Sequence, residues 1–289
     1  MKNYWIIADI HGEGEKFKRL LLEMSKSGFD LNDPSNVLVQ LGDRNDRGPD
    51  SYEVNEWFKV HQVMYPGQVI VLRGNHDQMM VDAAEGRSDL MYYNGGMATA
   101  RSYAKGLSLD SSVSADRLFP QAMRTSGHLD WLKHLPLYHE TEEYFFCHAP
   151  IPKEVYRSIP PGADFRTDAH TLIWSYESGP EEMWVDPNPV PIAEDGNFYG
   201  KGKIAVYGHI HGMYSIRGKI VVPGARRYGN AILLDTGSGC HKDGYLSCLR
   251  LPDFLVMNSK GESKILKTQE EVEKIRAELI GIPDNKVDF

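Results

Sequence analysis

Short apolar runs near the start of the chain alternate with segments whose apolar residues recur at helical spacing. Tyr4–Ala8, Val37–Leu41 and Val69–Leu72 are compact and apolar, and turn-forming residues precede or follow them, so we expect three buried strands. Gly14–Lys26 and Ser51–Met64 place apolar residues every three or four positions and predict helices. Strands that alternate with helices pair in parallel through right-handed crossovers, so the pattern predicts an α/β fold.

The pattern changes twice further along. Residues 81–143 mix polar and apolar positions at helical spacing; we expect a helix over Ser114–Leu135 and an insertion that shapes a pocket wall. From residue 144 onward, short apolar runs separated by turns predict a second, more antiparallel sheet. The runs are Tyr144–Cys147, Ile204–Tyr207, Lys219–Val222, Ala231–Leu234, Leu246–Leu251 and Phe254–Asn258.

Two further segments complete the predicted organisation. Residues 180–202 contain four prolines and favour a long ordered loop. Thr268 and Glu271 have the spacing of a capping box, which predicts a helix over about 268–281. Because no repeat or low-complexity linker interrupts the chain, we expect residues 1–289 to form a single domain.

Composition narrows the class of protein. The chain carries 40 acidic and 32 basic residues, a net charge of −8, and so lacks the broad basic field that binds nucleic acid or anionic membranes. The longest apolar run has five residues, against the ~20 that a membrane span needs. Three cysteines without a Cys-x-x-Cys spacing argue against a disulfide framework or a thiolate zinc site. We expect a cytoplasmic protein without a signal peptide.

Polar clusters follow five of the predicted strands, at the edge where open α/β sheets bind ligands. They contain aspartate, histidine, asparagine and arginine, and four of the five include a histidine. The clusters are Asp9-Ile10-His11-Gly12, Gly42-Asp43-Arg44-Asn45-Asp46-Arg47-Gly48, Arg73-Gly74-Asn75-His76-Asp77, His148, and Gly208-His209-Ile210-His211.

This mixture of ligands indicates divalent metal chemistry. Aspartate, histidine and asparagine without cysteine suit manganese, iron or zinc. Asp9 and His11 are two residues apart, so in an extended segment both side chains would face the same ion, and His209 and His211 repeat the arrangement. A carboxylate such as Asp43 could bridge two ions about 3.5–4 Å apart, a pair that generates a hydroxide and assists in-line displacement at phosphorus.

Each motif also has a structural explanation when taken alone. Asp9 could cap a helix, residues 42–48 could be a tight connection with surface ion pairs, and His148 could be a packed core histidine. Cys147 beside His148 suggests a nucleophile, but no base accompanies it, so we interpret it as a buried structural cysteine. The remaining histidines fit surface or packing roles, and Asp235-Thr236-Gly237 fits a turn below the site.

The five motifs in this order resemble those of the calcineurin-like metallophosphoesterases. Arg47-Gly48 after Asp46, and Arg73 before Gly74-Asn75-His76, resemble the phosphoprotein phosphatase branch. Gln78-Met79-Met80, Asn94-Gly95-Gly96 and the run from His128 to His148-Ala149-Pro150 resemble its small bacteriophage lambda-type serine/threonine phosphatases. The resemblance covers about residues 4–240. It implies an α/β/β/α sandwich of two mixed sheets flanked by helices, with the active site at the carboxyl ends of the strands.

The resemblance also implies roles for individual residues. Asp9 and His11 would bind a first metal, Asp43 would bridge, and Asn75, His148 and His209 would bind a second, with His211 as an additional ligand. His76 would protonate the leaving oxygen while Asp46 orients its ring. Arg47, Arg73 and Asn75 would hold the phosphate, and a metal-bridging water would be the nucleophile. Two manganese ions are expected, with iron or zinc as alternatives.

Three positions depart from the pattern of this branch. Asp77 stands where its protein phosphatases carry glutamate, as in the dinucleoside polyphosphate hydrolases. Tyr176 follows Ile173-Trp174-Ser175 where the phage enzymes have a phosphate-binding arginine, for which Arg157 or Arg166 could substitute. His211 matches the Gly-His-x-His of the wider superfamily instead of the branch itself.

Two enzymatic functions and one non-enzymatic function therefore stay open. The first is hydrolysis of a phosphomonoester, either phosphoserine or phosphothreonine in a protein or a small phosphoester. Phosphotyrosine stays open as a further substrate. The second is hydrolysis of a dinucleoside polyphosphate or another phosphoester. The third is a non-catalytic scaffold, which we disfavour because every metal and acid position is filled.

Overall fold

The computed structural model describes residues 2–110, 112–150, 169–174, 203–211, 214–216, 219–221, 224–228 and 230–267. Strands β1 (Asn3–Ile7), β2 (Asn36–Gln40) and β3 (Val69–Val71) pair in parallel, joined by α1 (Gly14–Lys26) and α2 (Ser51–Met64). The predicted order of strands and helices in this first part of the chain is confirmed, and the strand ends shift by at most one residue.

A second sheet has the order β4-β5-β6-β10-β9. Its central strands β5 (Tyr144–Cys147), β6 (Ile204–Tyr207) and β10 (Ala231–Leu233) are mutually parallel. Only the edge strands β4 (Tyr138–Glu140) and β9 (Arg226–Tyr228) run antiparallel. The second sheet is therefore mixed, and it is more antiparallel than the β1–β3 part of the first sheet, as predicted. Its parallel centre could not be predicted, because short runs with turns between them do not reveal which strands become neighbours.

The last described strands return to the first sheet. β11 (Ser247–Leu251) pairs antiparallel with β1, and β12 (Leu255–Asn258) and β13 (Ser263–Ile265) extend that edge, giving the order β13-β12-β11-β1-β2-β3. Placing residues 246–258 in the second sheet was therefore a wrong prediction. β7 (Tyr214–Ile216) and β8 (Lys219–Val221) form a separate two-stranded hairpin.

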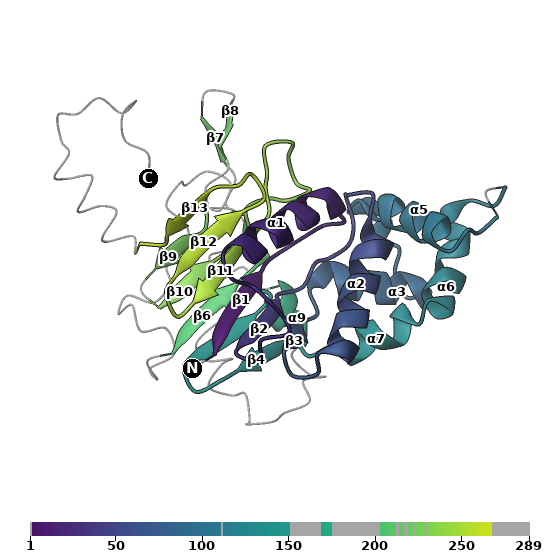
Figure 1. Ribbon diagram of the computed structural model, residues 1–289. Helices are drawn as coiled ribbons and strands as arrows, with labels where there is room; N and C mark the ends of the chain where they lie inside the picture. The colour runs from purple at the N-terminus through teal and green to yellow at the C-terminus, as the bar shows by residue number, and fades with distance from the viewer. Residues whose placement is uncertain are drawn as a thin grey trace.

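The region after β3 is helical, as predicted. α3 (Asn75–Ala84), α4 (Leu90–Tyr93) and α5 (Gly96–Gly106) precede α6 (Ala115–Thr125) and α7 (His128–His134). The single helix predicted over 114–135 is wrong: it is interrupted at Gly127, whose φ of 71° lies in the left-handed region that favours glycine. Figure 1 shows α2, α3, α5, α6 and α7 gathered beside the β1–β3 part of the first sheet.

Alternating side chains of the strands build a layered core. Trp5 and Ile7 of β1 pack with helical residues such as Phe17 and Phe58, while Ile6 faces a cluster between the two sheets. The far face of the second sheet packs on α9 (Ala169–Trp174). The order helices, sheet, sheet, helix confirms the α/β/β/α sandwich, and the strand ends of both sheets supply the residues of the site.

Several predictions lie outside the described residues. They concern the loop over 180–202, the helix over 268–281, and the side chains of Arg157, Arg166 and Tyr176. Among the described residues, no helix is both long and apolar enough to cross a membrane.

Candidate metal centre and active site

Key side chains of the site lie just beyond the strand ends, on left-handed backbone. His11, Asp43 and His209 have φ values of 51°, 55° and 63°. The extended geometry predicted for His11 and His209 is therefore wrong. The turn after β1 is imposed by the loop after β2, because the backbone N–H groups of Ile10 and His11 both donate to the Asp43 carbonyl, at 2.9 and 3.0 Å.

Two groups of possible metal ligands meet at Asp43. One ligand atom each from His11, Asp43 and His76 lie within 4.8 Å of one another, as do atoms from Asp43, His148 and His209. The His148 Nε2 atom is 3.4 Å from Asp43 Oδ2. Asp43 alone belongs to both groups, so it is the residue that could be shared by two ions.

The ring orientation of two histidines fits metal binding. The Nδ1 atom of His11 lies 2.9 Å from the Asn45 carbonyl oxygen, and that of His148 lies 3.0 Å from the Leu41 carbonyl oxygen. A carbonyl can only accept, so both Nδ1 atoms carry the proton and both Nε2 atoms face the centre. Such a backbone partner is the usual support for a metal-ligating imidazole. The described residues therefore fit a pair of divalent cations.

Asp9 reaches the same region from another direction. Its two carboxylate oxygens each accept from the His209 backbone N–H at 3.1 Å. The approach requires glycine at 208, because a Cβ there would lie 2.2 Å from Asp9 Oδ1. Burial, together with Asp235 and Asp43, raises the pKa of Asp9 well above its usual range. A cation beside this carboxylate would offset that penalty, although Asp9 belongs to neither of the two ligand groups.

The charges at the centre are strongly coupled. Burial disfavours the ionised form of Asp43, but His148 and His76 hold the pKa of that carboxyl well below its usual range. Burial likewise disfavours the imidazolium of His148, yet Asp43 and Asp9 raise the pKa of His148 to about 9. Burial lowers the pKa of His209 to about 3 and that of His11 well below its usual range. His209 and His11 are therefore neutral near pH 7, the form that ligates a metal.

His76 and Asp46 form the predicted pair. The His76 Nδ1 atom lies 2.7 Å from Asp46 Oδ2. Asp46 is held in turn by Thr99 of α5, whose hydroxyl donates to Asp46 Oδ1 at 2.8 Å and accepts from the Asp46 backbone N–H at 2.8 Å. Sequence reasoning missed Thr99, because nothing in the pattern of α5 marks a residue 53 positions away from its partner.

The two predicted phosphate-binding arginines differ in surroundings. The Arg47 guanidinium lies 2.8 Å from His11 Nε2 and 3.2 Å from His76 Nε2, so it stands inside the centre. Arg73 donates to Gln78 Oε1 at 3.1 Å, at the start of α3. The third predicted phosphate contact, Asn75, has its Oδ1 atom 2.8 Å from His148 Nε2.

Asp77 faces the interior of the protein. It is fully buried, forms an ion pair with the equally buried Arg44 at 2.8 Å, and accepts from the backbone N–H groups of Asp43 and Gly74 at 3.1 and 2.9 Å. Asp77 therefore contacts the site through the backbones of Asp43 and Gly74. Apart from its place inside the motif, nothing in the sequence indicated that Arg44 forms this buried ion pair.

Two other residues from the sequence prediction, His211 and Cys147, belong to neither ligand group. His211 is partly exposed and belongs to neither ligand group, so its role as a ligand stays a prediction. Cys147 is fully buried, its thiol donates to the Leu172 carbonyl at 3.3 Å, and burial raises its pKa to about 12. Its structural interpretation is confirmed.

Comparison with known proteins gives consistent results. The model of the calcineurin-like phosphoesterase family matches residues 2–213. Serine/threonine-protein phosphatase 1 of Salmonella typhimurium is 28% identical over 199 residues, 65% of this chain and 80% of that protein. The asymmetrical bis(5′-nucleosyl)-tetraphosphatase PrpE of Bacillus subtilis is 26% identical over 254 residues, 87% and 91% of the two chains.

A solved structure supports the fold. A cold-active protein tyrosine phosphatase superposes with a TM-score of 0.55 at 14% identity, over 93% of this chain and 79% of that one. The similarity to the Salmonella phosphatase agrees with the phosphoprotein phosphatase branch. Together with the family match over most of its length, these findings show that the chain belongs to the calcineurin-like phosphoesterases.

Proposed function

We propose that this enzyme is a metal-dependent phosphomonoesterase that hydrolyses phosphoserine and phosphothreonine, with phosphotyrosine as a further substrate to be tested. The observation that carries the proposal is the His76–Asp46 pair, which lies beside Arg47 and whose His76 belongs to one of the two ligand groups that share Asp43. The Salmonella relative named as a serine/threonine-protein phosphatase supports this choice of substrate.

The chain's own residues divide the work as follows. His76 donates a proton from Nε2 to the leaving oxygen, while Asp46 holds the ring in place through Nδ1. Arg47 and Arg73 hold phosphate oxygens, since a guanidinium matches a phosphate with two parallel donors. Two divalent cations, manganese by preference, would supply charge neutralisation and an activated water when bound. Their proposed ligands are Asp9, His11, Asp43, Asn75, His148, His209 and His211.

The proposal extends to the organisation of the chain. We infer a single domain, with residues 81–143 forming one wall of the active site. Two contacts support that role: Thr99 binds Asp46, and the Gly95 carbonyl accepts from the Arg47 backbone N–H at 3.2 Å.

A second candidate function is hydrolysis of a dinucleoside polyphosphate. The Bacillus relative named as a tetraphosphatase covers more of this chain than the Salmonella phosphatase does, 87% against 65%. Tyr176, in place of a phosphate-binding arginine, favours the same alternative. Both functions would use the same metal centre and the same acid.

An initial-rate panel separates these functions. Phosphoserine and phosphothreonine peptides, p-nitrophenyl phosphate, diadenosine tetraphosphate and a phosphodiester are compared with manganese added. We expect the highest kcat/KM on a phosphopeptide. A higher value on diadenosine tetraphosphate would overturn the preferred function in favour of the alternative.

Chelation tests the dependence on metal separately. Exhaustive removal of metal should abolish turnover of every substrate in the panel, and manganese should restore it. Asp43→Asn should bind at least one ion fewer by metal analysis, because Asp43 belongs to both ligand groups. Full activity of the metal-stripped enzyme would contradict the proposed mechanism.

A further inference from the structure

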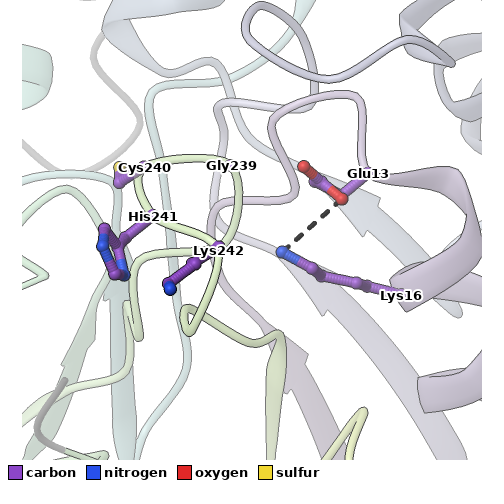
Figure 2. Close-up of a pocket in the computed structure, with 6 residues that line it drawn as sticks. All are labelled: Glu13, Lys16, Gly239, Cys240, His241 and Lys242. Atoms are coloured by element: carbon purple, nitrogen blue, oxygen red, sulfur yellow. Dashed lines mark ion pairs between the residues drawn. The ribbon is translucent and has the colours of Figure 1, made fainter.

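A pocket of about 410 Å³ opens between the loop after β10 and the entry to α1. Figure 2 shows residues 239–242 of the loop on one side, and Glu13 and Lys16 of the α1 entry on the other. Nothing in the proposed reaction uses these side chains. The residues that line the pocket are Glu13, Lys16, Gly239, Cys240, His241 and Lys242.

This pocket shares a wall with the reaction centre. The Arg47 guanidinium contacts the Cys240 thiol on one side and lies 2.8 Å from His11 Nε2 on the other. A Cβ at Gly239 would lie 2.6 Å from the His11 Cβ, so the loop backbone packs directly on a predicted metal ligand. A substrate whose phosphate is held by Arg47 therefore has the pocket next to that phosphate.

The pocket lining carries two lysines and one glutamate, whereas the whole chain has a net negative charge. Lys16 is paired with Glu13 at 3.5 Å, and His241 lies 3.5 Å from Asp243. Within the described part of the chain, Lys242 has no ion-pair partner. An ammonium is a compact donor that binds phosphate or carboxylate oxygens as a point charge.

The loop that carries Lys242 is fixed in place. The Ser238 hydroxyl donates to the Ile10 carbonyl at 3.3 Å, and the Cys240 backbone N–H donates to the Gly237 carbonyl at 3.0 Å. The Lys260 ammonium donates to the Asp243 carbonyl at 3.1 Å, just after Lys242. Because the backbone is already ordered, binding an anion there costs little additional conformational entropy.

We propose that this pocket is a subsite for a second anionic group of the substrate, next to the phosphate that is hydrolysed. The inference rests on the proposed function, because it needs the scissile phosphate at Arg47. The second group could be a carboxylate that flanks a phosphorylated residue or a further phosphate of a polyphosphate chain, and both would be bound by the same ammonium groups.

The test compares Lys242→Gln and Lys16→Gln with the unmodified enzyme, with manganese added. The substrates are p-nitrophenyl phosphate, a phosphoserine peptide with flanking aspartates, the same peptide with flanking asparagines, and diadenosine tetraphosphate. Lys18→Gln is the matched control. Lys18 lies on α1 like Lys16 and pairs with Glu15, but it does not line the pocket.

We expect Lys242→Gln to lower kcat/KM roughly threefold to tenfold on a substrate with a second anionic group, the size of one partly exposed charged contact. The aspartate peptide and diadenosine tetraphosphate show which source supplies the anion. Turnover of p-nitrophenyl phosphate and the asparagine peptide should change less than twofold. Equal losses on all four substrates, or no loss on any, would overturn the subsite. Absence of turnover in the unmodified enzyme would instead overturn the proposed function.

Discussion

Residues of the active site hold backbone conformations that their side chains disfavour. Seven non-glycine residues in the described part of the chain have positive φ, and five belong to the site: His11, Asp43, Asp46, Arg47 and His209. Each such residue costs on the order of 1–3 kcal/mol, so it persists only where neighbouring contacts enforce it. At His11 those contacts come from the Asp43 carbonyl, and at Asp46 from the Thr99 hydroxyl. The strain is concentrated at the candidate active site.

The first prediction concerns proton donation by His76. His76→Asn should lower turnover of an alkyl phosphate by roughly 10²–10⁴-fold, the usual contribution of a general acid. The loss should be smaller on p-nitrophenyl phosphate, because p-nitrophenolate needs little protonation to leave. Metal content, measured in the same preparation, should stay at two ions. Equal losses on the two substrates would argue against His76 as the acid.

A related prediction concerns Thr99, which sequence analysis did not identify. Thr99→Val keeps the shape of the side chain but removes the hydrogen bonds that hold Asp46. We expect a shift in the pH profile of kcat for the alkyl phosphate, because Asp46 then orients His76 less firmly. A lower amount of folded protein with an unchanged pH profile would assign Thr99 a structural role only.

His211 provides the third prediction. If it completes the coordination of one ion, His211→Ala should weaken the binding of that ion by about 10–100-fold, and excess manganese should partly restore turnover. Calorimetric titration of the metal-free protein with manganese measures the change. Two ions bound at unchanged affinity would show that His211 is not a ligand.

At the scale of elements, a chain of buried hydrogen bonds links the helical region to the loop that carries Asp43. From Arg44 it runs through Asn55 of α2 and Tyr103 of α5 to His128 of α7, with contacts of 3.1, 3.2 and 2.7 Å. On its other side Arg44 pairs with Asp77, which binds the Asp43 backbone N–H. The loops after β2 and β3 are thus fixed to each other and to three helices.

The fourth prediction follows from the buried pair. Asp77→Asn leaves the Arg44 guanidinium buried without an anionic partner, which should lower the free energy of unfolding by about 3–5 kcal/mol. Replacing both members, as Arg44→Met with Asp77→Asn, should recover part of that loss because the pair then leaves no unpartnered guanidinium in the interior. Urea denaturation of the metal-free variants measures both values. A double variant no more stable than Asp77→Asn would contradict this account of the pair.

At the scale of the whole molecule, stability should depend on pH through His128. This side chain is fully buried between Tyr103 and Glu56. Burial and the nearby Lys59 ammonium lower the pKa of His128 to about 4, because together they outweigh the opposite effect of the Glu56 carboxylate. Unfolded histidine has a pKa near 6.5, so between these values the unfolded chain binds the extra proton. The contribution of His128 to the free energy of unfolding is therefore fully present above about pH 6.5 and is lost as the pH falls toward 4.

This fifth prediction is measured by urea denaturation between pH 4 and 7. Because other histidines titrate too, the difference between the unmodified protein and His128→Gln isolates His128. As the pH falls from 7 to 4, the free energy of unfolding of the unmodified protein should decrease by on the order of 2–3 kcal/mol more than that of the variant. Parallel curves for the two proteins would show that His128 takes up no proton on unfolding in this range.

Strands β1–β3, the helices between them and the polar motifs at the strand ends could be predicted from the amino-acid sequence. These features are local: apolar periodicity fixes the type of element, and turn residues fix its ends. The residue types of the motifs suggested that Asp43 could be shared by two ions, whereas the His76–Asp46 pair was expected only from the resemblance to a known family.

The pairing of distant segments could be learned only from the fold. β11 and β12 pair with the first sheet because the open edge of β1 can accept them, which no local pattern reports. Thr99 and Arg44 acquire their roles from partners tens of residues away or from burial that the fold creates. The left-handed backbone of His11 and His209 is likewise imposed by hydrogen bonds from other loops, so the extended geometry expected from spacing alone could not hold.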